Sequence, residues 1–313
     1  MHSAGVGHSK YLCGSGIMNF RERPLVFPCN DSLLYGILSV PEKTGARGVL
    51  IVVGGPQYRV GSHRQFTLLA RHLAADGVTV LRFDYRGMGD SEGELRTFED
   101  LEDDLRCAID KFLEEVPSLN ELVIWGLCDA ASAALFYAYR DKRITGLVLL
   151  NPWVRTDQGA AQTYLKHYYL ARFFEREFWS KVWDGRFNYS KATQSLAKMV
   201  AQAFSGRKRI AASVKNKKDK ETGFDRSCDP ANLPERMLDG LSHFRGKILL
   251  ITSGNDLTAQ EFLNLANNSR KWKKLLSSSR ISRLNLPEAN HTFSRREWRE
   301  KVAVWTSEWI HSW

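Results

Sequence analysis

Runs of apolar, often β-branched residues recur along the chain, and segments with helical periodicity separate them. The runs predict strands over residues 23–27, 32–40, 48–53, 78–83, 121–125, 144–150, 247–252 and 281–286. The periodic segments predict helices over residues 65–76, 98–116, 130–139 and 258–276, and a last helix that Ser294 caps and that runs toward Trp313. This alternation predicts an α/β fold, with a mostly parallel sheet that carries helices on both faces.

The pattern of strands and helices is interrupted over residues 155–246, and we interpret this segment as an inserted helical lid. Residues 18–154 and 247–313 then form the α/β core. Residues 1–17 precede the first strand-like pattern, so we expect a disordered leader there, with a short ordered arm as the alternative.

The formal net charge is +10, and most of it lies in the predicted lid, which has 18 Lys and Arg against 10 Asp and Glu. A basic surface can bind nucleic acid, but a solvated loop explains the basic run over residues 207–220 more simply, so no nucleic-acid partner is predicted. An acidic polysaccharide or a membrane surface is the alternative, because residues 164–183 are rich in aromatic side chains. The chain has no apolar stretch of about 18 residues, so no integral membrane association is predicted.

Five cysteines are scattered along the chain: Cys13, Cys29, Cys107, Cys128 and Cys228. They form no CxxC pair and no Cys/His cluster at metal-ligand spacing, so neither a metal nor a cofactor is predicted. An odd number of scattered cysteines without an export signal indicates reduced thiols and a cytoplasmic location.

One of these cysteines lies where a strand runs directly into a helix. The sequence there is Gly126-Leu127-Cys128-Asp129-Ala130. A nucleophile on such a sharp turn needs small residues two positions before and two positions after it, because the backbone approaches itself closely. Gly126 and Ala130 meet this demand, although the usual pattern has Ser in place of Cys128 and Gly in place of Ala130. By itself this motif also fits a buried, inert cysteine.

Two further residues follow in the chain order that enzymes with this kind of turn use, which is nucleophile, acid and histidine. Asp256 comes after the next-to-last predicted strand, and His291 comes after the last one. The carboxyl ends of parallel strands meet at one edge of the sheet, where ligands bind in open α/β sheets. We therefore predict a catalytic triad in which Cys128 attacks an acyl carbonyl, His291 transfers the proton and Asp256 orients the imidazole.

An oxyanion hole needs two backbone N–H donors. The residue after the nucleophile, Asp129, is one expected donor, and the turn after the third predicted strand should supply the other. Pro56 in that turn has no N–H, so Gly55 is the favoured donor, with Gln57 as the second choice.

Arg59 and His63 follow this turn, and we assign them to binding an anionic part of the substrate, with a solvated helix start as the alternative. The segment 84–91, Asp-Tyr-Arg-Gly-Met-Gly-Asp-Ser, is interpreted as structural. Its glycines permit tight backbone turns, and Asp84 and Arg86 can brace neighbouring loops.

Segments 54–65 and 84–91 and the turn over 126–130 together resemble the first type of exosortase A system-associated hydrolase, within the α/β-hydrolase superfamily. The resemblance covers residues 18–313 and implies the α/β-hydrolase fold. It also implies a bacterial enzyme encoded beside exosortase and exopolysaccharide functions, but no particular substrate. A cysteine nucleophile is similar to that of dienelactone hydrolase, although the large lid and Ala130 depart from that pattern.

Two reactions fit the predicted triad. One is hydrolysis of an ester or thioester through an acyl-enzyme, and the other is transfer of the acyl group to a sugar or amine. A non-catalytic binding protein on the same scaffold is a third alternative. The expected partner is a small-molecule or carrier-bound acyl substrate, and the oligomeric state is left open.

Overall fold

The computed structural model describes residues 8–13, 16–55, 57–154 and 233–313. Their strands form one sheet in the order β1-β2-β3-β5-β4-β6-β7-β8-β9. The bounds are β1 His8–Cys13, β2 Gly16–Cys29, β3 Ser32–Pro41, β4 Arg47–Val52, β5 Thr79–Asp84, β6 Glu121–Leu127, β7 Ile144–Leu150, β8 Lys247–Asn255 and β9 Ile281–Asn290. From β5 across to β9 all neighbours are parallel, whereas β1, β2 and β3 pair antiparallel. The prediction of a mostly parallel sheet is confirmed.

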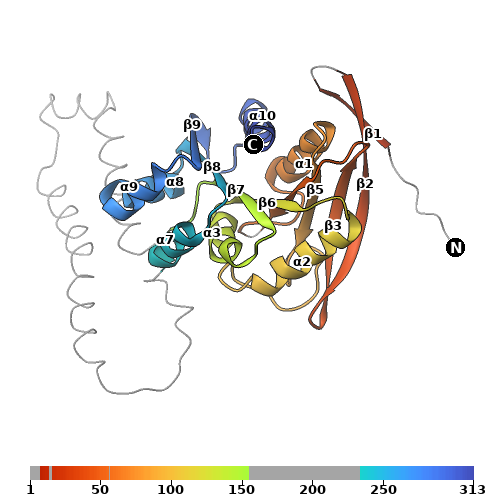
Figure 1. Ribbon diagram of the computed structural model, residues 1–313, viewed down its shortest axis with the longest axis horizontal. Coiled ribbons are helices and arrows are strands. Elements are labelled where there is room, and N and C mark those ends of the chain that lie inside the picture. Colours follow the sequence, from red (N-terminus) through yellow and green to blue (C-terminus); the bar gives the residue numbers. More distant parts are fainter. Residues whose placement is uncertain (1–7, 14–15, 56, 155–232) are drawn as a thin grey trace, which may run out of the picture.

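Helices cover both faces of this sheet. Their bounds are α1 Gln65–Ala75, α2 Glu102–Glu115, α3 Asp129–Tyr137, α7 Leu233–His243, α8 Leu257–Asn268, α9 Arg270–Leu276 and α10 Arg296–His311, with short 3-10 helices η1 Ser62–Arg64 and η2 Ala138–Arg140. Figure 1 shows α1 and α10 together on one face, with α2 and α3 on the other. No helix among the described residues is long and apolar enough to cross a membrane.

The first residues of the chain differ from the expected disordered leader. Residues 8–13 form β1, which pairs antiparallel with the first half of β2. The strand β2 begins at Gly16 and not near residue 23, and it runs to Cys29. Pairing with β1 satisfies backbone groups that β2 would otherwise expose at the edge of the sheet. The remaining residues of the predicted leader lie outside the described part.

The predicted lid falls mostly on residues 155–232, which lie outside the described residues. Its described end is helix α7, which packs against α3. Met237 and Leu241 of α7 are fully buried in the main hydrophobic cluster. Burial of each such side chain contributes about 1.5–3 kcal/mol, so α7 is part of the core packing.

Besides the start of α2, which lies at Glu102 and not at residue 98, two helix boundaries differ from the sequence prediction. The helix predicted over residues 258–276 is split at Ser269, whose side chain caps the second piece, α9. Ser294 does not cap α10, because the helix begins two residues later, after Arg295, and Ser294 instead exchanges hydrogen bonds with Asn290. Both differences arise from local side-chain hydrogen bonds that a hydrophobic period does not encode.

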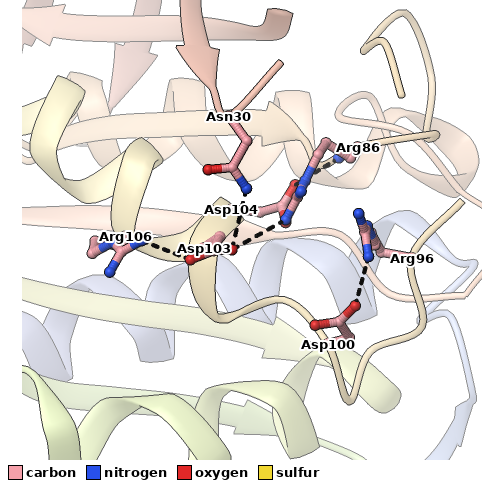
Figure 2. Close-up of polar contacts among 7 residues, drawn as sticks. All are labelled: Asn30, Arg86, Arg96, Asp100, Asp103, Asp104 and Arg106. Atoms are coloured by element: carbon pink, nitrogen blue, oxygen red, sulfur yellow. Dashed lines mark hydrogen bonds and ion pairs between the residues drawn. The ribbon is translucent and has the colours of Figure 1, made fainter. Parts of the chain in front are cut away.

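The segment over residues 84–91 braces the loops beside the sheet, as expected. The guanidinium of Arg86 binds the buried carboxylate of Asp104 on α2, with Nη2 and Oδ2 2.7 Å apart (Figure 2). The more exposed Asp103 lies 3.8 Å from the same Nη2. Asp84 itself is fully buried and accepts a 2.6 Å hydrogen bond from the backbone N–H of Arg59. These charge-assisted bonds tie the loop after β5 to α2 and the loop after β4 to the end of β5.

The ends of the central strands lie level with one another. Leu127, the last residue of β6, is opposite Leu150 of β7, and Leu150 is opposite Ile251 of β8. The residues that directly follow these strands therefore gather at the carboxyl edge of the sheet. This is the edge at which open α/β sheets bind ligands.

Candidate active site

Cys128 occupies the sharp turn between β6 and α3. Its backbone has φ 64° and ψ −124°, which places a residue with a side chain in a region that favours glycine. Such a conformation costs about 1–3 kcal/mol and persists only where surrounding contacts enforce it. Here the N–H of Cys128 donates to the carbonyl of Leu150 at 2.9 Å, and its carbonyl accepts from Trp153 at 3.2 Å. Neighbouring β7 and its following loop thus hold the turn.

The small residues of this turn are required by close backbone approach. A Cβ atom on Gly126 would lie 2.7 Å from the carbonyl carbon of Ala130. A Cβ on Gly54, just after the neighbouring strand β4, would lie 2.3 Å from the carbonyl oxygen of Leu127. Ala130 is itself completely buried. Gly126 and Ala130 are therefore required to be small for steric reasons, as the sequence motif indicates.

Asp256 and His291 come together at the same edge of the sheet. The Nδ1 of His291 lies 2.8 Å from Oδ2 of Asp256. Asp256 precedes α8, and its carboxylate also accepts hydrogen bonds from the N–H groups of Thr258 and Ala259 at 3.1 and 3.2 Å. Its side chain is only 6% exposed, whereas that of His291 is 34% exposed. A carboxylate fixed by a helix N-terminus can hold an imidazole in one orientation and stabilise its protonated form.

Asn151 is part of this arrangement and was not identified from the sequence. It follows β7, is fully buried and has φ 42°. Its Oδ1 accepts from the N–H of Ser253 at 2.9 Å, and its Nδ2 donates to Ser253 Oγ at 2.8 Å and to the carbonyl of His291 at 3.3 Å. It therefore links the end of β8 to the histidine loop. The Asn-Pro pair directly after this strand was the clue available in the sequence.

Within the described residues, the thiol of Cys128 makes no hydrogen bond to the ring of His291. Burial, with a contribution from the neighbouring charge of Asp129 and a smaller one from Asp256, raises the pKa of Cys128 to about 12. The N–H of Asp129 donates to the sulfur and opposes this increase. In this structure the thiol is protonated at neutral pH.

The two expected turn donors of the oxyanion hole already have acceptors. The N–H of Gly55 donates to the carboxylate of Asp129, at 2.8 Å from Oδ1 and 3.0 Å from Oδ2. The N–H of Gln57 donates to the carbonyl of Gly55 at 2.8 Å. Only the backbone of Asp129 was predicted to take part in the site. Its side chain occupies the position where a substrate oxygen would accept a hydrogen bond from the N–H of Gly55.

Arg59 and His63 are placed differently from the expected anion-binding pair. The guanidinium of Arg59 forms ion pairs with Asp84 and with Asp90, so its charge is already balanced. His63 is exposed, with φ 52°, in η1. Among the described residues, neither side chain forms an ion pair with Asp256 or His291.

A cleft of about 590 Å³ opens beside Gly55 and Asp129. Its walls are mainly apolar and aromatic and include Tyr58, Tyr85, Met88, Leu95 and Phe98. Leu95 and Tyr58 are unusually exposed for their size, at 70% and 49%. An apolar cleft with a few polar groups at its end has the character of a small-molecule site.

Comparison with known proteins agrees with this geometry. Residues 45–217 match the family of serine aminopeptidases, S33, and this is more than half of the chain. The quorum-quenching protein AidA of Acinetobacter baumannii is 28% identical over 149 residues, which cover 45% of this chain and 47% of that protein. The polyketide transferase claH of Penicillium crustosum is 30% identical over 127 residues, which cover 39% of this chain and 41% of that protein. The chain thus spans less than half the length of these two relatives.

A solved structure shows a similar fold. The Pyrococcus furiosus esterase PF2001 superposes with a TM-score of 0.59 at 16% identity, over 94% of this chain and 91% of that one. The sheet order, the turn at Cys128 and this superposition define an α/β-hydrolase fold. The chain belongs to the serine aminopeptidase S33 family of the α/β-hydrolase superfamily, with a cysteine at the position where the usual turn has serine.

Proposed function

We propose that the protein is a hydrolase that cleaves an ester or thioester with Cys128 as nucleophile, His291 as general base and acid, and Asp256 as the residue that orients His291. The observation that carries this proposal is the position of Cys128 on a strained turn at the same sheet edge as the 2.8 Å pair of His291 and Asp256. A nucleophile held in a strained turn beside an oriented base is the arrangement that covalent catalysis requires.

The reaction follows from these roles. The Sγ of Cys128 forms a bond to the acyl carbon while His291 takes the thiol proton, and the carbonyl electrons move onto oxygen. When they return, the bond to the leaving oxygen or sulfur breaks, and His291 passes the proton to that atom. Water, activated by His291, then attacks the acyl-enzyme and releases the acid and the free thiol.

Cys128 and His291 must approach each other before the first step, since they share no hydrogen bond among the described residues. Such contacts often tighten only when substrate is bound. Transfer of a proton to His291 then overcomes a thiol pKa of about 12, because the thiolate forms only as it attacks.

Acyl transfer is the second candidate, and the similarity to proteins named polyketide transferases favours it. In that case a sugar hydroxyl or an amine replaces water in the second step. We also propose, from the sequence resemblance, a link to exosortase and exopolysaccharide systems and a small-molecule or carrier-bound acyl donor. A free thiol nucleophile would suit the reducing cytoplasm.

Trapping the acyl-enzyme tests this proposal. The full chain is mixed with a 4-nitrophenyl ester, quenched in acid and examined by intact-mass and peptide spectrometry. An acyl adduct on Cys128, absent in Cys128→Ala and retained in Cys107→Ala, is expected. An unmodified Cys128 with unchanged ester would instead indicate a binding protein. A faster loss of the adduct and a new acylated product when a polysaccharide or amine acceptor is added would favour transfer over hydrolysis.

A further inference from the structure

The carboxylate of Asp129 is held at the inner end of the cleft by backbone groups alone. The N–H of Gly55 donates to both of its oxygens, and the N–H of Ala130 donates to Oδ1 at 2.9 Å. Burial raises the pKa of this carboxyl, and hydrogen bonds from the N–H groups of Gly55, Ala130 and Asp129 itself oppose the increase. The group is therefore partly desolvated and lies directly beside the nucleophile, which is the preceding residue.

No Lys or Arg among the described residues forms an ion pair with Asp129. The other charged residues that line the cleft have such partners. Figure 2 shows the ion pair of Arg96 with Asp100, in which Nη1 lies 2.9 Å from Oδ2, and Glu99 pairs with Arg236 of α7. Asp129 is thus the charge in the cleft that has no side-chain counter-ion in the described part of the chain, although protonated His291 would act on it at a distance.

We propose that Asp129 determines substrate specificity. The site takes an acyl group that carries an ammonium or another hydrogen-bond donor near its carbonyl, and it disfavours an acyl group that carries a carboxylate. This proposal rests on the proposed function, because it concerns the acyl group that Cys128 receives. A desolvated carboxylate between apolar walls such as Tyr85 and Phe98 interacts more strongly with a ligand charge than an exposed one does.

The same contact explains how the oxyanion hole becomes available. In the described structure the carboxylate uses the N–H of Gly55, which a carbonyl oxygen would need. A donor on the acyl group offers the carboxylate a new partner, and the N–H of Gly55 can then turn to the carbonyl. The N–H of Asp129, which donates to the sulfur of Cys128 before the acyl group binds, then supplies the second donor from the start of α3. An acyl group without a donor must break the Asp129–Gly55 bond with no replacement, and an anionic one also meets charge repulsion.

Three 4-nitrophenyl esters of matched shape test this. Butyrate ends in a methyl group, 3-aminopropionate in an ammonium and succinate in a carboxylate, and the alkylammonium is charged at about pH 7. Second-order acylation rates are measured for each ester and divided by its rate with 2-mercaptoethanol, which removes differences in intrinsic reactivity. Wild-type protein, Asp129→Asn and the control Glu94→Gln are compared. Glu94 is an exposed carboxylate on the loop that leads to the cleft wall.

The wild type should prefer 3-aminopropionate over butyrate, and butyrate over succinate, each by about tenfold, the factor that 1.4 kcal/mol provides. Asp129→Asn keeps an oxygen acceptor for Gly55 and Ala130 but removes the charge, so the ratio of 3-aminopropionate to succinate should fall at least tenfold. Glu94→Gln should leave this ratio within twofold of the wild type.

The possible failures are distinguishable. If the wild type forms Cys128 adducts with all three esters at similar normalised rates, the specificity proposal is overturned and the proposed function is not. This wild-type comparison stands even where Asp129→Asn does not fold. A ratio that Asp129→Asn leaves unchanged also overturns it. No adduct on Cys128 with any ester overturns the proposed function and, with it, this inference.

Discussion

A single hydrogen bond of 2.8 Å joins His291 to Asp256, and the same carboxylate caps helix α8. The orientation of the imidazole therefore depends on a helix end and not on a mobile loop. Two of the four first N–H groups of a helix are thereby satisfied by a group that also contacts the proposed base.

Asp256→Asn should reduce ester hydrolysis about 10²–10⁴-fold, because the amide can no longer stabilise protonated His291. The amide oxygen still accepts from the N-terminus of α8, so the melting temperature should change little. Steady-state kinetics and a thermal melt measure the two effects. Activity within threefold of the wild type would mean that this pair does not serve catalysis.

The reactivity of the Cys128 thiol should increase steadily with pH. Because its pKa is raised to about 12, only the growing thiolate fraction reacts, and the rate of iodoacetamide labelling should rise about tenfold per pH unit from about pH 7 to 10. Labelling of Cys128→Ser gives the background from the other cysteines. A plateau near pH 8.5, or at lower pH, would instead indicate an unperturbed thiol or a stable thiolate and imidazolium pair.

Asn151 should support both stability and activity. Asn151→Asp keeps the size, the tolerance of positive φ and one acceptor, but it loses the donors to Ser253 Oγ and to the carbonyl of His291. We expect a loss of about 1–3 kcal/mol in the free energy of unfolding, measured in urea, and a lower kcat. Asn285, which accepts a hydrogen bond from Thr252 at 3.0 Å farther from the histidine loop, provides a control. Equal effects of Asn285→Asp on kcat would count against a specific role of Asn151.

The contribution of the Arg86–Asp104 ion pair to stability can be distinguished from that of the neighbouring, exposed Asp103. The side chain of Asp104 is fully buried and that of Asp103 is 42% exposed, and both face the same guanidinium. Asp104→Asn should destabilise the fold by about 3–5 kcal/mol, because it leaves a buried charge without its partner. Asp103→Asn should cost less than about 1 kcal/mol. Equal midpoints in urea for the two variants would contradict this assignment.

The sequence predicted the elements that are buried on both faces. The runs in β4, β7 and β8 are found within three residues of their predicted bounds, because a strand between two helical layers is apolar throughout. The strand β1 was missed, since residues 8–13 show no alternation that could distinguish an edge strand from a leader. Its formation depends on pairing with β2 and not on its own composition.

The site was predictable where it depends on local geometry and chain order. The small residues Gly126 and Ala130 indicate the steric limits around Cys128. The order of the strands brings Asp256 and His291 to one edge of the sheet. The side chain of Asp129 was not predicted to contact Gly55, because these residues lie 74 positions apart and meet only through the sheet. Arg59 was expected to bind an anionic part of the substrate, because its ion pair with Asp84, which is distant in sequence, could not be predicted.

The backbone of Cys128 has a consequence for how the protein tolerates change. A residue with φ 64° is strained whenever it carries a Cβ, so Cys128→Gly should be more stable than Cys128→Ala by about 1 kcal/mol, measured in urea, although both lack the sulfur. This reverses the order in which alanine and glycine usually stabilise a chain beside a helix. Selection for stability alone would thus replace Cys128 with glycine. If Cys128 is the proposed nucleophile, its retention exchanges some stability of the fold for reactivity.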